Sequence, residues 1–195
     1  MLADTSHSLI CRLKADNSGD DWNVFVKIYR PFIMGYLRRC DITGQDADDV
    51  CQNVLTQVVQ GIARFEHNDR VGAFRTWLRK IARQRIWEFI HSRQKSNRLI
   101  NNLRAFNSED DVGLVIDEHW DREHDRYVVN RLLQLIRPEF THRTWESFRA
   151  VVLGSEKPAA VANRLGVTAN SVLIAKSRIM KRLRETGDGL IDSLE

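Results

Sequence analysis

Apolar side chains recur every three or four residues along most of this 195-residue chain, and this spacing is the feature that most constrains its fold. Such a spacing places the apolar groups on one face of an α-helix, whereas a half-buried strand would alternate at every second residue. The chain has only 10 glycines and 3 prolines, so few positions interrupt the pattern. We therefore predict an all-α protein in which amphipathic helices bury their apolar faces against one another.

Three helical stretches fill the first half of the chain. Residues 20–37 form the first, and Pro31 inside it removes one backbone hydrogen bond and should kink this helix or split it in two. The second stretch covers residues 46–65 and the third about residues 73–93. Together they predict a small N-terminal helical domain over residues 1–104.

Charge is strongly segregated along the chain, although the net charge is only +4. Residues 70–104 hold ten basic residues against one acid, and residues 105–125 hold eight acids against one arginine. Residues 155–186 again favour bases, seven to two. Basic blocks on folded segments attract polyanions such as nucleic acids. The alternative for any one block is a solvated helix face.

The helix over residues 73–93 has three faces. Its core stripe holds Phe74, Leu78, Ala82, Ile86 and Phe89. A row of arginines at four-residue spacing consists of Arg75, Arg79 and Arg83. The third row holds Trp77, Lys80, Gln84, Trp87 and His91. Aromatic groups beside cations can stack on unpaired bases while the cations hold phosphates, which is the chemistry of single-strand binding. The alternative is that the two tryptophans only broaden the core.

The acidic stretch 105–125 is typical of a linker between domains, and the helical periodicity resumes at Arg126. Residues 157–172 then have the form of a helix-turn-helix, in which Gly166 suits the tight turn and Thr168 can cap the second helix. On that second helix, the residues expected to point inward are Val172, Ala175, Ile179 and Leu183. The opposite row resembles what a recognition helix offers to a major groove, and it holds Asn170, Ile174, Ser177 and Lys181, with Arg178 at its side. We predict a second helical domain over residues 126–187, with a purely structural hairpin as the alternative.

Other chemistries have weak support. His119, Glu123 and His124 could suggest a metal site, but their spacing matches no strong ligand motif, so no metal is expected. The 3 cysteines form no CxxC pair and are expected to be free thiols rather than a redox switch. The first residues lack a secretory signal pattern, and no apolar run approaches the ~20 residues of a membrane span, so a cytoplasmic protein is expected.

These motifs together resemble the extracytoplasmic-function (ECF) subfamily of bacterial RNA polymerase sigma factors, over about residues 20–186. Residues 46–53 are similar to the acidic helix that binds the clamp helices of the polymerase large subunit. Residues 72–83 are similar to the helix that melts the promoter and reads its minus-ten element. The turn at 165–167 and the helix after it are similar to the element that reads the minus-thirty-five sequence.

The resemblance implies a role for each group of residues. The contacts to core polymerase would come from Asp46, Asp49, Gln52, Asn53 and Thr56. The contacts to the opened minus-ten region would come from Arg75, Arg79, Lys80, Arg83, Gln84, Trp87 and His91. The contacts to the minus-thirty-five element would come from Thr168, Asn170, Ser171, Ile174, Lys176, Ser177, Arg178 and Lys181. Leu173 and Ile174 stand where the family often has a Lys-Ser pair.

The expected function is that of a dissociable sigma subunit without catalytic residues or cofactors. Its partners would be core RNA polymerase and promoter DNA, and the family allows an anti-sigma protein as a further partner. The acidic stretch is expected to run through the polymerase cleft towards the RNA exit path. The alternative for this stretch is an intramolecular lid that pairs with Arg75, Arg79 and Arg83.

Two other classes of function compete with the sigma hypothesis. A helix-turn-helix regulator that ignores polymerase would leave the acidic helix at 46–53 and the tryptophan-bearing basic helix unexplained. A nucleic-acid enzyme would need clustered carboxylates, or a nucleophile beside a base. The carboxylates of this chain instead lie at a helix start or in the acidic stretch.

Overall fold

A computed structural model of the chain describes residues 9–15, 19–66, 72–96 and 108–191. These residues are mostly helical and contain no β-strand, which confirms the predicted all-α class. The helices are α1 (Leu9–Ala15), α2 (Gly19–Arg39), α3 (Gly44–Gly61), α4 (Ala73–Ser96), α5 (Glu109–Ile136), α6 (His142–Val152), α7 (Pro158–Leu165) and α8 (Ala169–Gly187). Short 3-10 turns follow α3 at Ile62–Arg64 and α5 at Arg137–Glu139.

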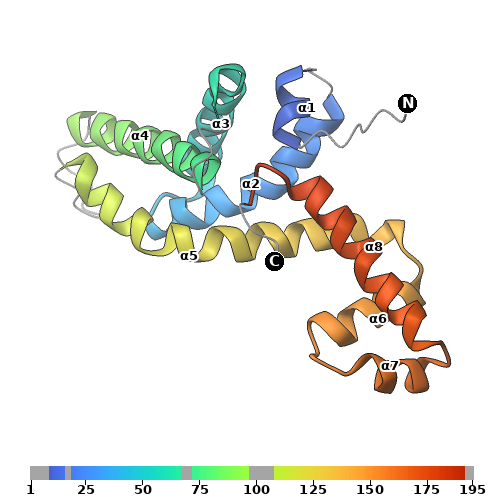
Figure 1. The fold of residues 1–195 in the computed structure, drawn as a ribbon. Helices are drawn as coiled ribbons and strands as arrows, with labels where there is room; N and C mark the ends of the chain where they lie inside the picture. The colour runs from blue at the N-terminus through green and yellow to red at the C-terminus, as the bar shows by residue number, and fades with distance from the viewer. Residues whose placement is uncertain (1–8, 16–18, 67–71, 97–107, 192–195) are drawn as a thin grey trace.

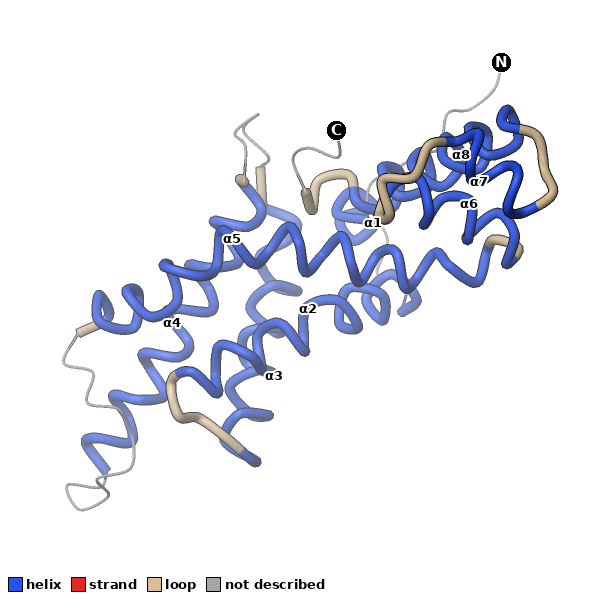
Figure 2. Tube along the Cα trace, turned by 90° about the horizontal axis from the view of Figure 1, so that it is seen from below, coloured by secondary structure: helices blue, strands red, loops and turns tan. Residues whose placement is uncertain are grey.

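Helix α5 runs the length of the molecule and joins its two ends (Figure 1). It packs against α4, α2 and α8. Its contacts with α2 extend from Trp120 to Arg131. Viewed from below, the α6–α8 group lies at the far end of α5 from α4 (Figure 2). One continuous core extends from α1–α4 through α5 to α6 and α8, and a small second cluster joins α7 to α8 through Val161, Ala162 and Val172.

The prediction that helical periodicity resumes only at Arg126 is wrong, because α5 begins at Glu109 and continues without a break through the predicted boundary. A capping box starts it: Ser108 Oγ accepts from the backbone N–H of Asp111, whose carboxylate accepts from the Ser108 N–H. Residues 105–107 of the predicted linker lie outside the described residues. The acidic stretch is therefore helical from its fifth residue onward.

A series of buried residues at four-residue spacing explains how α5 packs against helices at both ends of the molecule. The series consists of Val112, Ile116, Trp120, His124, Val128, Leu132 and Ile136. Because four residues exceed one helical turn, each step moves the stripe by ~40°, and six steps move it by about 240°. The early members therefore face the N-terminal helices, and the late members turn towards α8.

Pro31 does not split the first long helix, because α2 is one helix from Gly19 to Arg39. Proline has no N–H, so the carbonyl of Lys27 loses its usual partner one turn earlier. Arg131 of α5 donates a hydrogen bond from Nη2 to that carbonyl at 2.9 Å. The side chain of one helix thus compensates for the missing backbone bond of another.

Two helices joined by a tight turn, α7 and α8, lie where the sequence predicted them. Gly166 has a φ of 61°, a left-handed conformation that costs glycine little, and Thr168 Oγ1 accepts from the Ser171 N–H at 3.1 Å. The four residues expected to point inward from α8 are all buried. On α4, the last member of the core stripe is Ile90 rather than Phe89, because Ile90 continues the four-residue series from Ile86 and is fully buried.

Two short segments outside the predicted helices complete the core. Helix α1 buries Leu9, Ile10 and Leu13. After α8, Leu190 and Ile191 are also buried, and an isolated bridge pairs Asp188 with Ile191. The packed part of the C-terminal half therefore extends beyond residue 187.

Candidate functional site

The polar face of α3 is open along most of its length. Its exposed residues from the predicted polymerase-binding set are Asp49, Gln52, Asn53 and Thr56. Asp46 is half-buried and forms an ion pair with Arg93 near the end of α4. Asp49 accepts a hydrogen bond from Gln45 one turn earlier at 3.0 Å, which orients its carboxylate along the helix. The opposite face is buried through Ala47, Val50, Cys51, Val54 and Val58.

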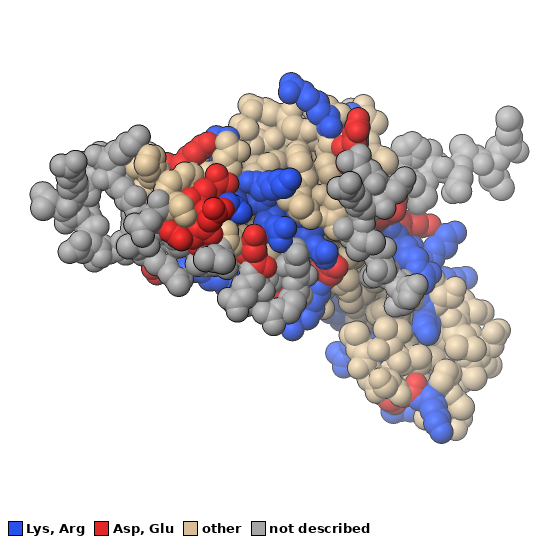
Figure 3. Space-filling model, turned by 60° about the vertical axis from the view of Figure 1, so that its left-hand side comes forward, with Lys and Arg blue, Asp and Glu red and all other residues tan. Residues whose placement is uncertain are grey.

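The arginine row of α4 is occupied by carboxylates of α5. Arg75 Nη1 lies 2.8 Å from Asp125 Oδ2, and Arg79 Nε lies 3.4 Å from Asp117 Oδ1. Arg83 contacts Asp110 at 2.6 Å and Glu109 at 3.2 Å. The pairs advance along α4 while they retreat along α5, as in two antiparallel helices. Acidic side chains lie beside basic ones on this side of the molecule (Figure 3).

Packing holds α5 in this position. Trp120 is fully buried, with ring centroids 4.8 Å from Phe32 and 4.7 Å from Tyr36. A Cβ atom at Gly113 would lie 2.7 Å from the Arg83 guanidinium, so a larger residue here would displace the end of the Arg83 side chain. The three arginine side chains keep only 16–25% of their surface exposed. The row is therefore part of a helix–helix interface in this structure.

His124 connects this interface to the core. Its Nε2 lies 3.2 Å from the hydroxyl of Tyr29, and its Nδ1 lies 2.8 Å from Asp125 Oδ1. Although burial alone would raise the pKa of Asp125, the hydrogen bond from His124 and the charge of Arg75 together lower it. Burial raises the pKa of Tyr29, so its hydroxyl stays protonated.

The suggested metal-ligand set is not assembled by the described residues. His124 is occupied as above, and Glu123 accepts from Arg39 Nη2 at 2.9 Å. The side chain of His119 lies outside what the structure describes. Among the described side chains, no group of three His, Cys, Asp or Glu residues could hold a metal ion.

The third row of α4 combines exposed polar residues with two tryptophans that lie against the edge of the core. Lys80, Gln84 and His91 are exposed, and Gln84 donates to Glu88 at 3.0 Å. Trp87 is half-buried and stacks on His91, with ring centroids 5.1 Å apart and planes 30° apart. Trp77 instead joins the core aromatics, 5.1 Å from Phe65 and 5.6 Å from Phe74. Both tryptophans pack partly against the core, and Trp87 in addition stacks on the exposed His91.

Helix α8 presents an open surface of mixed character. The predicted contact residues on it that are exposed are Asn170, Ser171, Ile174, Lys176, Ser177, Arg178 and Lys181. Lys176 and Arg178 form no ion pair among the described residues, and Lys181 lies 3.8 Å from Glu185. Leu173, which is absent from the predicted set, exposes 49% of its surface beside Ile174 at 43%. Of the three thiols, Cys40 and Cys51 are buried and Cys11 is exposed, and burial raises the pKa of Cys51 to about 11.

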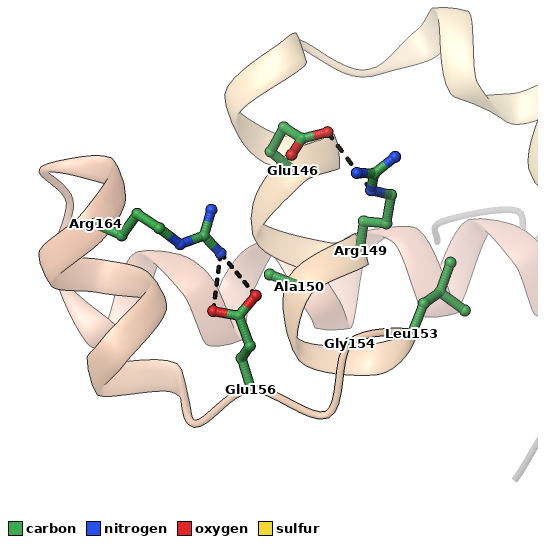
Figure 4. A pocket seen from close by; sticks show the side chains of 7 residues that line it. All are labelled: Glu146, Arg149, Ala150, Leu153, Gly154, Glu156 and Arg164. Atoms are coloured by element: carbon green, nitrogen blue, oxygen red, sulfur yellow. Dashed lines mark hydrogen bonds and ion pairs between the residues drawn. The ribbon is translucent and has the colours of Figure 1, made fainter.

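A small pocket of about 390 Å³ lies where α6 turns towards α7 (Figure 4). Its charged lining is paired internally: Arg149 lies 3.7 Å from Glu146, and Arg164 binds both carboxylate oxygens of Glu156. None of the predicted site residues lines this pocket. It is therefore separate from the open faces of α3, α4 and α8.

Comparison with known proteins adds one match. Residues 25–96, which span most of α2, all of α3 and α4, match the family model described as Sigma-70 region 2. The match supports a region of an RNA polymerase sigma factor, with a role in promoter recognition and transcription initiation. Sigma factors are not catalysts, in agreement with the prediction that the chain is not an enzyme. No curated protein and no solved structure matches the chain.

Proposed function

We propose that the chain is a dissociable sigma subunit of the ECF type, which binds core RNA polymerase and directs it to promoters. The observation that carries this proposal is the region 2 match, which falls on the α2–α4 bundle. A second support is that the same chain continues into α7 and α8, two helices joined by a short turn that we interpret as a helix-turn-helix. A regulator that ignores polymerase would need only this second part.

The polymerase contact is assigned to the open face of α3. Its exposed polar side chains include one uncompensated carboxylate at Asp49, and its carboxylates at Asp46 and Asp48 are paired to Arg93 and Arg30. A partly neutralised acidic face fits a partner with a basic surface, where complementary charge speeds and orients association. Asn53 and Thr56 extend the same face by one turn.

The minus-ten contact is assigned to the third row of α4, which is open, and not to its arginine row. Lys80 and Gln84 offer polar groups to the strand, and Trp87 with His91 offers a stacked pair of rings for an unpaired base. Arg75, Arg79 and Arg83 are assigned to holding α5. For the acidic stretch, these contacts favour the intramolecular pairing over a passage through the polymerase cleft.

The minus-thirty-five contact is assigned to α8. Its N-terminus is capped by Thr168, and beside Leu173 and Ile174 its outward residues include polar groups and cations that suit base-edge and phosphate contacts in a major groove. The proposed units are residues 1–104 for polymerase and minus-ten DNA and 126–187 for upstream DNA, with α5 rigidly connecting them in place of a tether.

The proposal also covers the cellular setting. We place the protein in the cytoplasm, with the polymerase and the chromosome. Among the described helices, none is long and apolar enough to cross a bilayer. An anti-sigma protein stays in the proposal as a further partner, because a competitor could cover the open faces of α3 and α8.

Capture of purified core polymerase tests the proposal. The chain is expected to retain core polymerase, and Asp49→Arg is expected to weaken this retention because it reverses the exposed negative charge of the α3 face. Asp20→Arg is the matched control, because Asp20 is an exposed carboxylate in the first turn of another helix, α2. No retention by the native chain, or equal retention by Asp49→Arg, would contradict the proposal.

A further inference from the structure

Two large apolar side chains are exposed side by side at the start of α8. Leu173 and Ile174 lie in its second turn with 49% and 43% of their surfaces exposed. The only other large hydrophobic residues with comparable exposure, among those the structure describes, are Val59 and Leu153. The inward face of α8 is already filled by Val172, Ala175 and Ile179, so the core does not account for this pair.

The surroundings of the pair are polar and basic. On a helical wheel, Asn170 and Ser177 point almost directly away from the buried side, and Leu173 and Ile174 flank them on either side. Arg178 follows one turn after Ile174 and forms no ion pair within the described residues, nor does Lys176. The patch is thus a small apolar area inside a cationic surface, which matches a polyanion that carries small apolar groups.

Duplex DNA meets this description at one kind of site. In the major groove, the 5-methyl group of thymine is the apolar group on the edges of the unmodified bases, and the other groups are hydrogen-bond donors and acceptors. A leucine or isoleucine placed over the polar edge of a G·C pair would leave those groups unpaired. Contact with a thymine methyl removes apolar surface from water on both partners.

We infer that Leu173 and Ile174 read thymine methyl groups in the minus-thirty-five element and thereby set its base preference. This inference rests on the proposed function, which brings α8 to the major groove. It adds Leu173 to the predicted contact residues and gives Ile174 an apolar role. Asn170, Ser177 and Arg178 then supply the hydrogen bonds and charge around these contacts.

Thymine-to-uracil substitution tests the inference, because uracil lacks the 5-methyl group and keeps every hydrogen-bonding group. The full chain with core polymerase first selects its preferred upstream element from random duplex. Each thymine of that element is then replaced singly by uracil, and the affinity is measured. At one or two positions, uracil should weaken binding by about fourfold, the value of one buried methyl-sized group.

Protein variants assign the effect to these side chains. Leu173→Ala or Ile174→Ala should reduce the thymine-to-uracil ratio at one position to about one, whereas Ile174→Val should retain most of it. Leu153→Ala is the control, because Leu153 is 61% exposed but lies at the end of α6. Circular dichroism checks that every variant keeps its helix content.

The outcomes separate this inference from the function on which it rests. A selected element without any methyl-dependent position, or a ratio unchanged in both alanine variants, overturns the inference and leaves the sigma proposal standing. The inference is also overturned, and the sigma proposal still stands, if the alanine variants keep the native thymine-to-uracil ratio but no longer bind a protein that the native chain binds. If no duplex sequence is selected at all, both the inference and the proposed function fail.

Discussion

Helices α4 and α8 both carry runs of basic residues, yet they expose this charge very differently. On α4, the arginine row is paired with carboxylates of α5 and is mostly shielded from solvent. On α8, Lys176 and Arg178 are exposed and form no ion pair among the described residues. A basic block in a sequence therefore indicates a nucleic-acid surface only after the carboxylates that fold against it are known.

The same comparison separates two uses of arginine. An arginine between two helices orients them and covers apolar surface with its stem, whereas an arginine on an open helix keeps its charge available to a ligand. On α4, the open row of Lys80, Gln84 and His91 lies on the other side of the helix from the paired row. One helix thus carries a structural face and a candidate binding face.

The largest expected effect comes from the anchor of α5. Trp120→Ala should lower the free energy of unfolding by about 3–5 kcal/mol, because it empties a fully buried site between Phe32 and Tyr36. Urea denaturation measures this change. A loss below ~1 kcal/mol would mean that α5 is held only weakly against α4. A nucleic acid would then displace α5 and expose the arginine row of α4, so that α4 and α8 would no longer differ in the exposure of their basic residues.

The next effect compares one arginine from each helix. Arg75→Ala should lower the free energy of unfolding by about 1–2 kcal/mol, because its ion pair with Asp125 is partly buried. Arg178→Ala should change stability by less than ~0.5 kcal/mol, and should weaken binding to the upstream element by about 1–3 kcal/mol if it contacts a base. Denaturation and duplex binding are measured on both variants. If Arg178→Ala destabilised the fold more than Arg75→Ala, or if Arg75→Ala weakened duplex binding more than Arg178→Ala, the comparison between α4 and α8 would be contradicted.

The smallest effect is a pH dependence at the paired row. The pKa of Asp125 is lowered in the folded chain, so its contribution to stability is present at neutral pH and is lost as the pH falls through that lowered value. Asp125→Asn should cost on the order of 1 kcal/mol at pH 7, since solvent screens a carboxylate that is 41% exposed. The stability difference between the two proteins should shrink in acid, below about pH 4. A difference that is constant between pH 3 and pH 7 would mean that the carboxylate charge is not responsible.

The sequence predicted the all-α class, the bounds of α3 and α4 within a few residues, and the residues that form the turn between α7 and α8. It did so because these elements depend on local signals such as apolar spacing, Gly166 and Thr168. It missed the first half of α5, where acidic composition outweighed two signals that were present. These were the Ser108–Asp111 capping box and the apolar series that begins at Val112.

Which charges face each other could not be predicted from periodicity. Arg83 and Asp110 are close only because α4 and α5 fold back as antiparallel neighbours, a tertiary fact without a local signal. The exposure of Leu173 is of the same kind, since spacing alone left open whether another helix would cover it. The contact of Arg131 differs in that half of it has a local signal. Pro31 predicts that the carbonyl of Lys27 lacks its usual backbone donor, but only the fold shows that Arg131 donates to it.

Run-off transcription on a promoter selected by the complex tests the central claim most directly. Core polymerase alone should give no specific transcript, and addition of the chain should give a transcript with one defined start. Asp49→Arg should reduce this transcript strongly, while Asp20→Arg should leave it unchanged. A specific transcript that does not depend on the chain, or equal transcription with Asp49→Arg, would contradict the account.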